Sequence, residues 1–212
     1  MKKIIFGLTL IVFCIFIFGC TSNQNGTNPN NFTQPLGDNL VAYKNTSLGV
    51  SFNYDSNLYR DTGLSTDTYE RLSKDTSEGD ICEVTITKTS IPDVQQFYLL
   101  DPSSSDTKEF IALGLNTSFN LENYKSFKTA QKFYDYNVIF VESKMVTISG
   151  TNAWKSISLS QYVDGAVLEA ITISLVRNNN LYEIVGRKFS SDNFDECLSA
   201  ANSVISSIKF LN

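Results

Sequence analysis

Alternating hydrophobic and polar positions predict a series of β-strands in the second half of the chain. Four β-rich runs follow one another, at residues 137–149, 152–163, 166–177 and 181–190. The connectors are short: Gly150-Thr151, Asp164-Gly165 and Asn178-Asn179-Asn180. Asp-Gly in particular favours the positive φ values of a tight hairpin turn. Strands joined by such short turns must be antiparallel, because a parallel pair needs a crossover connection.

Shorter strands are predicted nearer the N-terminus, at residues 41–44, 48–54 and 81–88. In the last of these, Cys82, Val84 and Ile86 share one face by the two-residue period of a strand. Residues 60–79 are polar and give no clear pattern.

Two helices are predicted. Asp106 and Glu109 form a capping-box pattern that opens a helix through about Asn116, and a less regular segment follows at residues 121–136. The second helix spans residues 192–208 with Ser191 as its cap. Its apolar stripe consists of Phe194, Cys197, Leu198, Ala201, Ile205 and Ile208.

The strand at residues 167–176 carries apolar side chains on both faces, so the sheet must be covered on both sides. The predicted fold class is α+β, a twisted antiparallel β-sheet with helices packed on both faces. No second break in composition occurs after Asp38, so residues 38–212 are expected to form one domain.

The N-terminus has the pattern of an export signal. Lys2 and Lys3 precede an uncharged hydrophobic run at residues 4–18, which is shorter than the roughly 20 residues of a membrane-spanning helix. Ile17-Phe18-Gly19-Cys20 resembles the lipobox of prokaryotic lipoproteins, in which the cysteine is lipidated and becomes the mature N-terminus. Residues 1–19 are therefore predicted to be a lipoprotein signal peptide and Cys20 the lipidation site, and Cys14 leaves with the signal.

Two alternatives remain, an uncleaved signal anchor and an ordinary secretory signal. All three interpretations place the residues after Cys20 outside the cytoplasm. Residues 20–37 contain Asn, Thr, Gly and Pro without any charge, which predicts a disordered tether. The expected location is the cell membrane, with the chain anchored by its lipid and facing the extracytoplasmic side.

Composition removes several classes of function. The 212 residues include no histidine, which excludes Ser-His-Asp and Cys-His triads and histidine-ligated zinc. With 22 acidic and 17 basic residues the chain carries a net charge of −5, so no nucleic-acid partner is expected. Sequons for N-glycosylation, relevant only in a host that modifies exported asparagines, occur at Asn25, Asn31, Asn45 and Asn116.

Once Cys14 is removed and Cys20 is lipidated, Cys82 and Cys197 remain. An even pair in an exported domain suggests a disulfide that would fasten the last helix to the sheet. The alternative is two buried free cysteines packed as small hydrophobic side chains.

Carboxylates are the remaining route to acid–base or metal chemistry. Candidates lie in two sets, Glu78, Asp80 and Glu83, and Glu142, Glu169 and Glu183. No EF-hand loop pattern occurs, and acids on strands usually form a solvated face, so no catalytic residue, metal site or cofactor is predicted. The aromatic residues Trp154, Tyr134, Tyr136, Tyr162 and Tyr182 are expected to pack in the core or in cross-strand pairs rather than to line a groove.

The order of elements resembles that of the PsbP-like superfamily. The resemblance rests on the segments at 41–44, 48–54, 180–184 and 204–210, and it covers roughly residues 40–210. It implies an α/β/α sandwich and a non-enzymatic accessory role. No metal site is carried over, because histidine ligands have no counterpart here.

The predicted function is a cell-envelope lipoprotein whose domain acts as a non-catalytic accessory or protein-binding module. Its expected partners are the membrane, reached through the N-terminal lipid, and a protein of the envelope. The alternative is an extracytoplasmic lipoprotein that binds a small solute or a metal ion.

Overall fold

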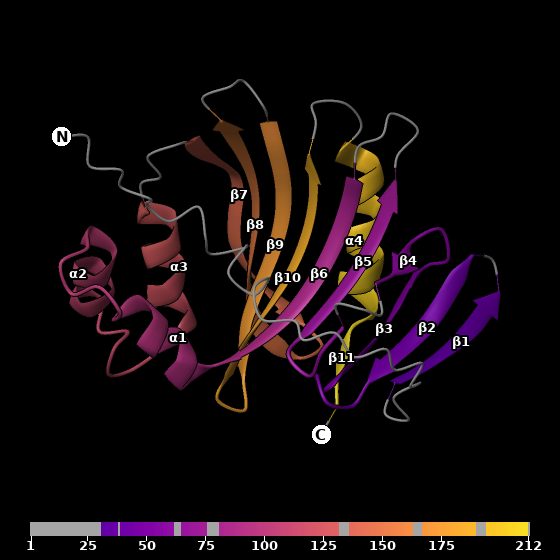
Figure 1. Ribbon diagram of the computed structural model, residues 1–212, viewed down its shortest axis with the longest axis horizontal. Helices are drawn as coiled ribbons and strands as arrows, with labels where there is room; N and C mark the ends of the chain where they lie inside the picture. The colour runs from indigo at the N-terminus through magenta and orange to yellow at the C-terminus, as the bar shows by residue number, and fades with distance from the viewer. Residues whose placement is uncertain are drawn as a thin grey trace, which may run out of the picture.

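The computed structural model describes residues 31–37, 39–61, 65–75, 81–131, 136–162, 167–189 and 194–211. These residues form the predicted α+β fold, which is built from two antiparallel sheets and four helices (Figure 1). The predicted single sheet is thus divided into a large sheet and a small one.

The large sheet has seven strands in the order β4-β5-β6-β10-β9-β8-β7. Their bounds are β4 (Tyr59–Arg60), β5 (Tyr69–Asp75), β6 (Ile81–Ser90), β7 (Tyr136–Ile148), β8 (Thr151–Tyr162), β9 (Val167–Arg177) and β10 (Asn180–Phe189). Positive φ angles at Ser149 and Gly150, and again at Asn178 and Asn179, make the tight turns that join β7 to β8 and β9 to β10. The predicted turn at Asp164-Gly165 lies outside the described residues.

The small sheet has four strands in the order β1-β2-β3-β11. They are β1 (Asn31–Gly37), β2 (Leu40–Asn45), β3 (Val50–Asp55) and β11 (Lys209–Phe210). The turn between β2 and β3 closes through Gly49, whose φ of 80° suits glycine. Strand β1 covers the last part of the segment that was predicted to be a disordered tether. It is ordered as a strand there because its backbone pairs with β2.

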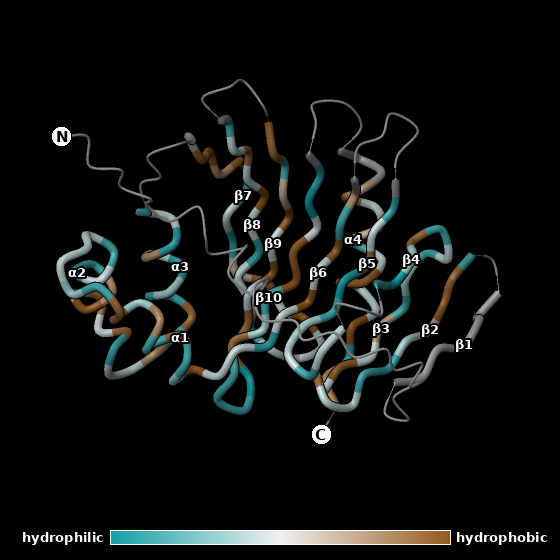
Figure 2. Tube along the Cα trace, in the orientation of Figure 1, coloured by the Kyte–Doolittle hydropathy of each residue, from teal (hydrophilic) through white to brown (hydrophobic). Residues whose placement is uncertain are grey.

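Helix α4 (Phe194–Ser207) packs across one face of the large sheet. Strand pairing places Val84, Ile86 and Ile184 on this face, which we call the α4 face. Ala201, Val204 and Ile205 of the helix join them in the main core, and Phe52 of the small sheet completes it. Four members of the predicted apolar stripe are buried and Leu198 is half-buried, while the side chain of Phe194 lies outside the described residues; the buried four are Cys197, Ala201, Ile205 and Ile208. In Figure 2, hydrophobic residues line much of β9, β10 and α4.

The other face of the large sheet is covered at one end by three helices, α1 (Ile91–Tyr98), α2 (Ser105–Ala112) and α3 (Leu121–Ala130). They lie at the opposite end of the molecule from the small sheet (Figure 1). Tyr98 stacks on Phe110, Phe127 meets both rings edge to face, and these three residues form a second core with Leu181 of β10. We call this the opposite face; because α4 covers the first face, the large sheet has helices on both.

The unpredicted regular elements are helices α1 and α3 and strands β1, β4, β5 and β11. Helix α1 has Pro92 in its first turn and a Ser90 cap that accepts from the Asp93 amide. The cap of α2 is Ser104, which accepts from the Thr107 amide, rather than the predicted Asp106. Ser191, the predicted cap of the last helix, lies outside the described residues.

No helix among the described residues is both long enough and apolar enough to span a membrane.

Helix α4 approaches the sheet closely at Gly186 of β10. A methyl group at this position would lie 2.3 Å from Cβ of Ala201 and 3.0 Å from Cγ2 of Ile171. Both distances are shorter than ordinary van der Waals contact. Helix α4 can therefore keep its observed separation from β10 only if residue 186 is glycine.

Gly186→Ala is expected to lower the free energy of unfolding by about 1–3 kcal/mol through overpacking. Urea denaturation would measure it. Ala201→Gly alone should cost about 1 kcal/mol of helix propensity, and the double variant should be more stable than the sum of the two losses. An unchanged midpoint for Gly186→Ala would contradict the close packing.

Candidate functional site

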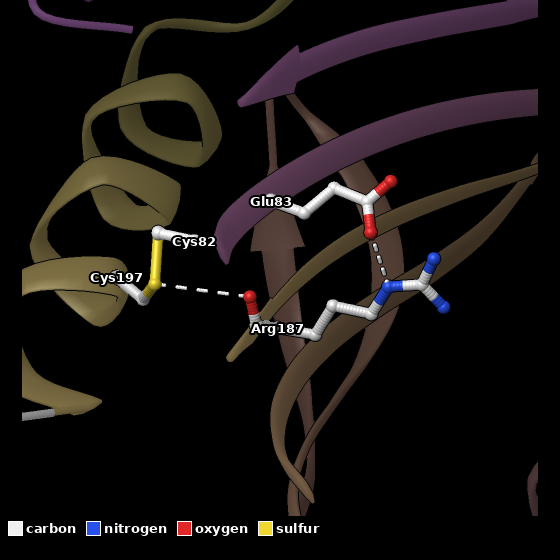
Figure 3. Close-up of a disulfide and its surroundings, with 4 residues drawn as sticks. All are labelled: Cys82, Glu83, Arg187 and Cys197. Atoms are coloured by element: carbon white, nitrogen blue, oxygen red, sulfur yellow. Dashed lines mark hydrogen bonds and ion pairs between the residues drawn. A yellow bond between two sulfur atoms is a disulfide. The ribbon is translucent and has the colours of Figure 1, made fainter. Parts of the chain in front are cut away.

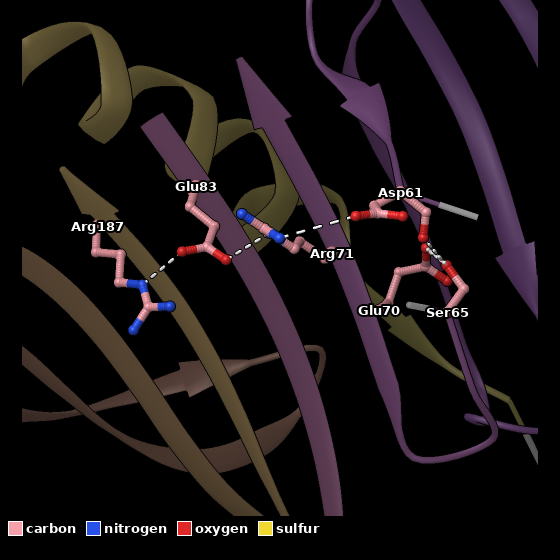
Figure 4. Close-up of polar contacts among 6 residues, drawn as sticks. All are labelled: Asp61, Ser65, Glu70, Arg71, Glu83 and Arg187. Carbon is pink, nitrogen blue, oxygen red and sulfur yellow. Dashed lines mark hydrogen bonds and ion pairs between the residues drawn. The ribbon is translucent and has the colours of Figure 1, made fainter. Parts of the chain in front are cut away.

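The most concentrated charges among the described residues lie on the opposite face, around Glu83 of β6. Its carboxylate sits between two arginines from the neighbouring strands (Figure 4). Oε1 is 2.6 Å from Nε of Arg71 on β5, and Oε2 accepts a hydrogen bond of 2.6 Å from Nε of Arg187 on β10. Arg71 also lies 3.8 Å from Asp61. Side-chain exposure is 4% for Glu83, against 22% for Arg71 and 16% for Arg187.

A second buried carboxylate, Glu70, points to the α4 face and meets the small sheet. It accepts hydrogen bonds from Tyr43 at 2.5 Å and from Ser65 at 2.6 Å, and Asn45 donates at 3.4 Å. Arg60 lies 3.8 Å from the carboxylate and its guanidinium stacks over the Tyr43 ring. Burial and the neighbouring Glu70 raise the pKa of the Tyr43 hydroxyl, so this tyrosine stays protonated as a donor.

These two carboxylates were not distinguished by the sequence pattern. Glu83 was a candidate only as part of a set with Glu78 and Asp80, and those two residues lie outside the described part of the chain. The structure pairs Glu83 with two arginines instead of with other acids. Burial raises the pKa of Tyr69 beside this network, and the Glu83 charge adds to that effect. A carboxylate compensated by two guanidiniums fastens β5, β6 and β10 together.

The other predicted acids do not converge. Glu183 lies on the opposite face and accepts from Tyr124 at 3.3 Å and from Ser174 at 3.2 Å. Glu142 and Glu169 lie on the α4 face, as their strand partners show. Within the described residues, no group of acids or cysteines is placed to hold a metal ion.

Cys82 and Cys197 are joined by a disulfide in the structure (Figure 3). Their Cα atoms are 5.4 Å apart, in the usual range for such bonds. Because Cys82 and Glu83 are neighbours on β6, they point to opposite faces. Arg187 contacts both the disulfide and Glu83. Its carbonyl oxygen is 3.7 Å from Sγ of Cys197, and its side chain donates a hydrogen bond to Glu83. The disulfide and the charged network therefore lie back to back.

A cleft of about 280 Å³ opens beside the disulfide. Its lining mixes apolar and polar side chains: Leu40, Asp55, Asn57, Leu58, Lys74, Cys82, Ser199, Ala200 and Ser203. The alternative of a small-solute site stays a prediction.

The predicted aromatic residues that are described pack inside the fold. Trp154 is buried and donates a hydrogen bond to Ser143, and Tyr182 is buried against Phe210. Tyr134 and the side chains of Tyr136 and Tyr162 lie outside the described part of the structure.

The four sequons differ in their setting. Asn45 is buried; its Oδ1 accepts from the Leu48 amide and its amide group donates to Glu70. A glycan would displace both contacts, so the folded domain does not offer Asn45 as an acceptor. Asn116 lies half-buried after α2. Asn25 and the side chain of Asn31 are outside the described residues, as is the predicted lipidation site Cys20.

An apolar surface lies at the end of α1. Phe97, Leu99 and Leu100 are 40%, 36% and 69% exposed; we call these three residues the α1 surface. Thr107 of α2 holds the turn that carries these residues, because its hydroxyl donates to the carbonyl oxygens of Tyr98 and Asp101. Sequence reasoning missed this surface, since α1 was not predicted.

No protein-family model matches the chain, and no curated protein matches its sequence. Solved structures do match. Cyanobacterial PsbP from Synechocystis sp. PCC 6803 is 14% identical, over 84% of this chain and 96% of that one, with a TM-score of 0.47.

Two further structures match with a TM-score of 0.42 each. LpqN of Mycobacterium tuberculosis, described as involved in cell envelope biogenesis, is 9% identical over 86% of this chain and 91% of that one. The Ran-binding protein Mog1p of Saccharomyces cerevisiae is 8% identical over 86% of this chain and 96% of that one. No residue role is carried over from these proteins.

Glu83→Gln should lower the free energy of unfolding by about 3 kcal/mol, because two guanidiniums would then face each other without a carboxylate. Chemical denaturation would measure the loss. Glu142→Gln is the matched control: Glu142 also contacts two cations, Lys144 and Lys155, but its side chain is 29% exposed. Its loss should stay below about 1 kcal/mol. Equal losses would contradict a special role of Glu83.

The disulfide should contribute stability by closing a long loop. With a sequence separation of 115, the chain-entropy model gives about 4–5 kcal/mol, so Cys197→Ser should unfold at much lower denaturant than wild type. Alkylation of the unreduced protein in denaturant, followed by mass measurement, tests the bond directly: Cys82 and Cys197 should resist alkylation until reductant is added, whereas buried free thiols would react once the chain is unfolded. Two reactive thiols without reductant would contradict the bond.

Proposed function

We propose that this chain is a cell-envelope lipoprotein whose domain is a non-catalytic binding module for another envelope protein, on the outer side of the membrane. The α1 surface is the observation that carries the proposal. The leader and Cys20 supply the anchor, and the domain supplies the contact.

Export is supported by the N-terminal sequence and by the cysteine pair. Disulfides persist in oxidising compartments and are rare in the cytoplasm of most organisms. The bond between Cys82 and Cys197 fits a domain that folds after export.

Three features suit the α1 surface to protein binding. Its three large apolar side chains are exposed and lie between positions 97 and 100 of the sequence, and burying such a side chain fully is worth about 1.5–3 kcal/mol. The side chains rest on a packed aromatic core of Tyr98, Phe110 and Phe127, so the turn loses little entropy on binding. Exposed apolar patches of this kind mark interaction sites.

The net charge points to a protein rather than to a lipid surface. The chain carries −5, and anionic headgroups repel such a domain. We assign membrane attachment to the lipid on Cys20 and leave the α1 surface for a protein partner.

A photo-crosslinking amino acid in place of Leu100, in the full-length protein in its own membrane, should give adducts with one recurring envelope protein. Tyr59 on β4 is the matched control site, because it is 53% exposed but far from α1. Adducts at Leu100 alone would support the proposal, and the same proteins captured at both sites, or only lipid, would overturn it.

A second variant separates binding from folding. Leu99→Lys should abolish the adduct at position 100 while leaving the thermal unfolding midpoint close to that of the wild type, because Leu99 is 36% exposed and a positive charge suits the C-terminal end of α1. Persistence of the adduct at full yield would show that the α1 surface does not form the contact.

A further inference from the structure

The small sheet has one face in the main core and one face turned outward. Tyr43 and Phe52 belong to the inner face and are buried. A groove of about 180 Å³ lies on the small sheet beside the last turn of α4, and its lining consists of Ala42, Tyr43, Lys44, Ser51, Phe52, Asn53, Ser207 and Lys209. Ser207 holds α4 against β3 here, because its hydroxyl accepts a hydrogen bond of 2.8 Å from the Asn53 amide. The groove is therefore built on regular elements.

Two lysines stand in one row across the outward face. Lys44 of β2 and Lys209 of β11 each lie directly opposite Ser51 of β3. Residues that are directly opposite in a sheet share a face, so the three side chains point to the same side. Neighbouring strands lie about 4.8 Å apart, which puts the Cα atoms of the two lysines about 10 Å apart, with Ser51 between them.

Nothing in the described residues neutralises these two lysines. Both are exposed, and in the described part of the chain neither ammonium group has a hydrogen bond or an ion pair. The described lining of the groove contains no acid. Because the whole chain carries a net charge of −5, this row is a local reversal of charge. Two cations on one face repel each other, and an anion between them would replace that repulsion by attraction.

We propose that this groove binds a phosphate group through Lys44 and Lys209. Phosphate oxygens accept charge-assisted hydrogen bonds from ammonium groups, and the two lysine side chains are long enough to meet one anion above Ser51. The Ser51 hydroxyl and the Asn53 side-chain amide are further donors on the same face. A phosphate suits the row better than a carboxylate, because its dianion supplies one negative charge for each lysine.

The groove is remote from the α1 surface. It belongs to the small sheet, which lies at the opposite end of the molecule from α1, α2 and α3 (Figure 1). Phosphate binding and protein binding can therefore be lost independently of each other.

Lysine footprinting tests the site in the full-length protein, held in neutral phosphatidylcholine vesicles. An amine-acylating reagent modifies the lysines, and mass spectrometry measures the rate at each position. A bound phosphate should slow the acylation of Lys44 and Lys209 about threefold or more, because the anion covers both amines and favours their protonated form. Lys108 of α2 is the internal control, since it is exposed and lies far from the groove.

Two arms of the experiment identify the carrier of the phosphate. In the first arm, glycerol phosphate is added to the neutral vesicles. In the second arm, part of the phosphatidylcholine is replaced by phosphatidic acid and no soluble phosphate is present. Protection of both lysines in the first arm assigns the site to a soluble phosphate ester, and protection in the second assigns it to a lipid headgroup. Each of these results supports the proposal.

A charge variant tests whether the two lysines act together. Lys44→Gln should remove most of the protection of Lys209, because one exposed ammonium group alone holds an anion weakly. Lys108→Gln is the matched control, since it removes the same charge elsewhere and should leave the protection of Lys44 and Lys209 unchanged. Both variants should keep the thermal midpoint of the wild type.

The charge of the phosphate gives a second readout. Protection relative to Lys108 should increase between about pH 5 and about pH 7.5, because a phosphate ester gains its second negative charge near pH 6. No protection in either arm, equal protection of Lys108, full protection of Lys209 in Lys44→Gln, or protection that falls as the pH rises would overturn the proposal.

Discussion

The packing of α4 against β10 is the contact on which the rest of the structure depends. At Gly186 the sheet has no side chain, and Ala201 fills the space, which lets Val204 and Ile205 reach the main core. The same helix also contacts β3 of the small sheet, and Ser207 accepts from the Asn53 amide at 2.8 Å. The two sheets therefore share one helix, and the disulfide at Cys197 fixes it near its N-terminal end.

The buried charges act on the same elements from both faces of the large sheet. Glu83 links β5, β6 and β10 on the opposite face, and Glu70 links β5 to the small sheet on the α4 face. A buried carboxylate is costly unless it is paired and hydrogen-bonded, and both are satisfied. These groups fix the relative positions of the strands.

The hydrophobic pattern predicted the elements whose burial follows a simple period: β6, the meander from β7 to β10, and α4. It could not predict α1 or α3, because short helices are decided by caps and by packing partners such as Tyr98 and Phe127, which meet only in the fold. It could not predict the Glu83 network either. Glu83 and Arg187 are 104 positions apart. The sequence pattern of a strand also does not distinguish an acidic residue that is buried from one that is exposed to solvent.

Native-state hydrogen exchange with the disulfide intact tests the central claim most directly. If α4 is the shared support of both sheets, the amides of residues 200–207 should exchange only through global unfolding, with the same opening free energy as β9 and β10. Exchange of α4 through a local opening, while the strands stay protected, would contradict the account.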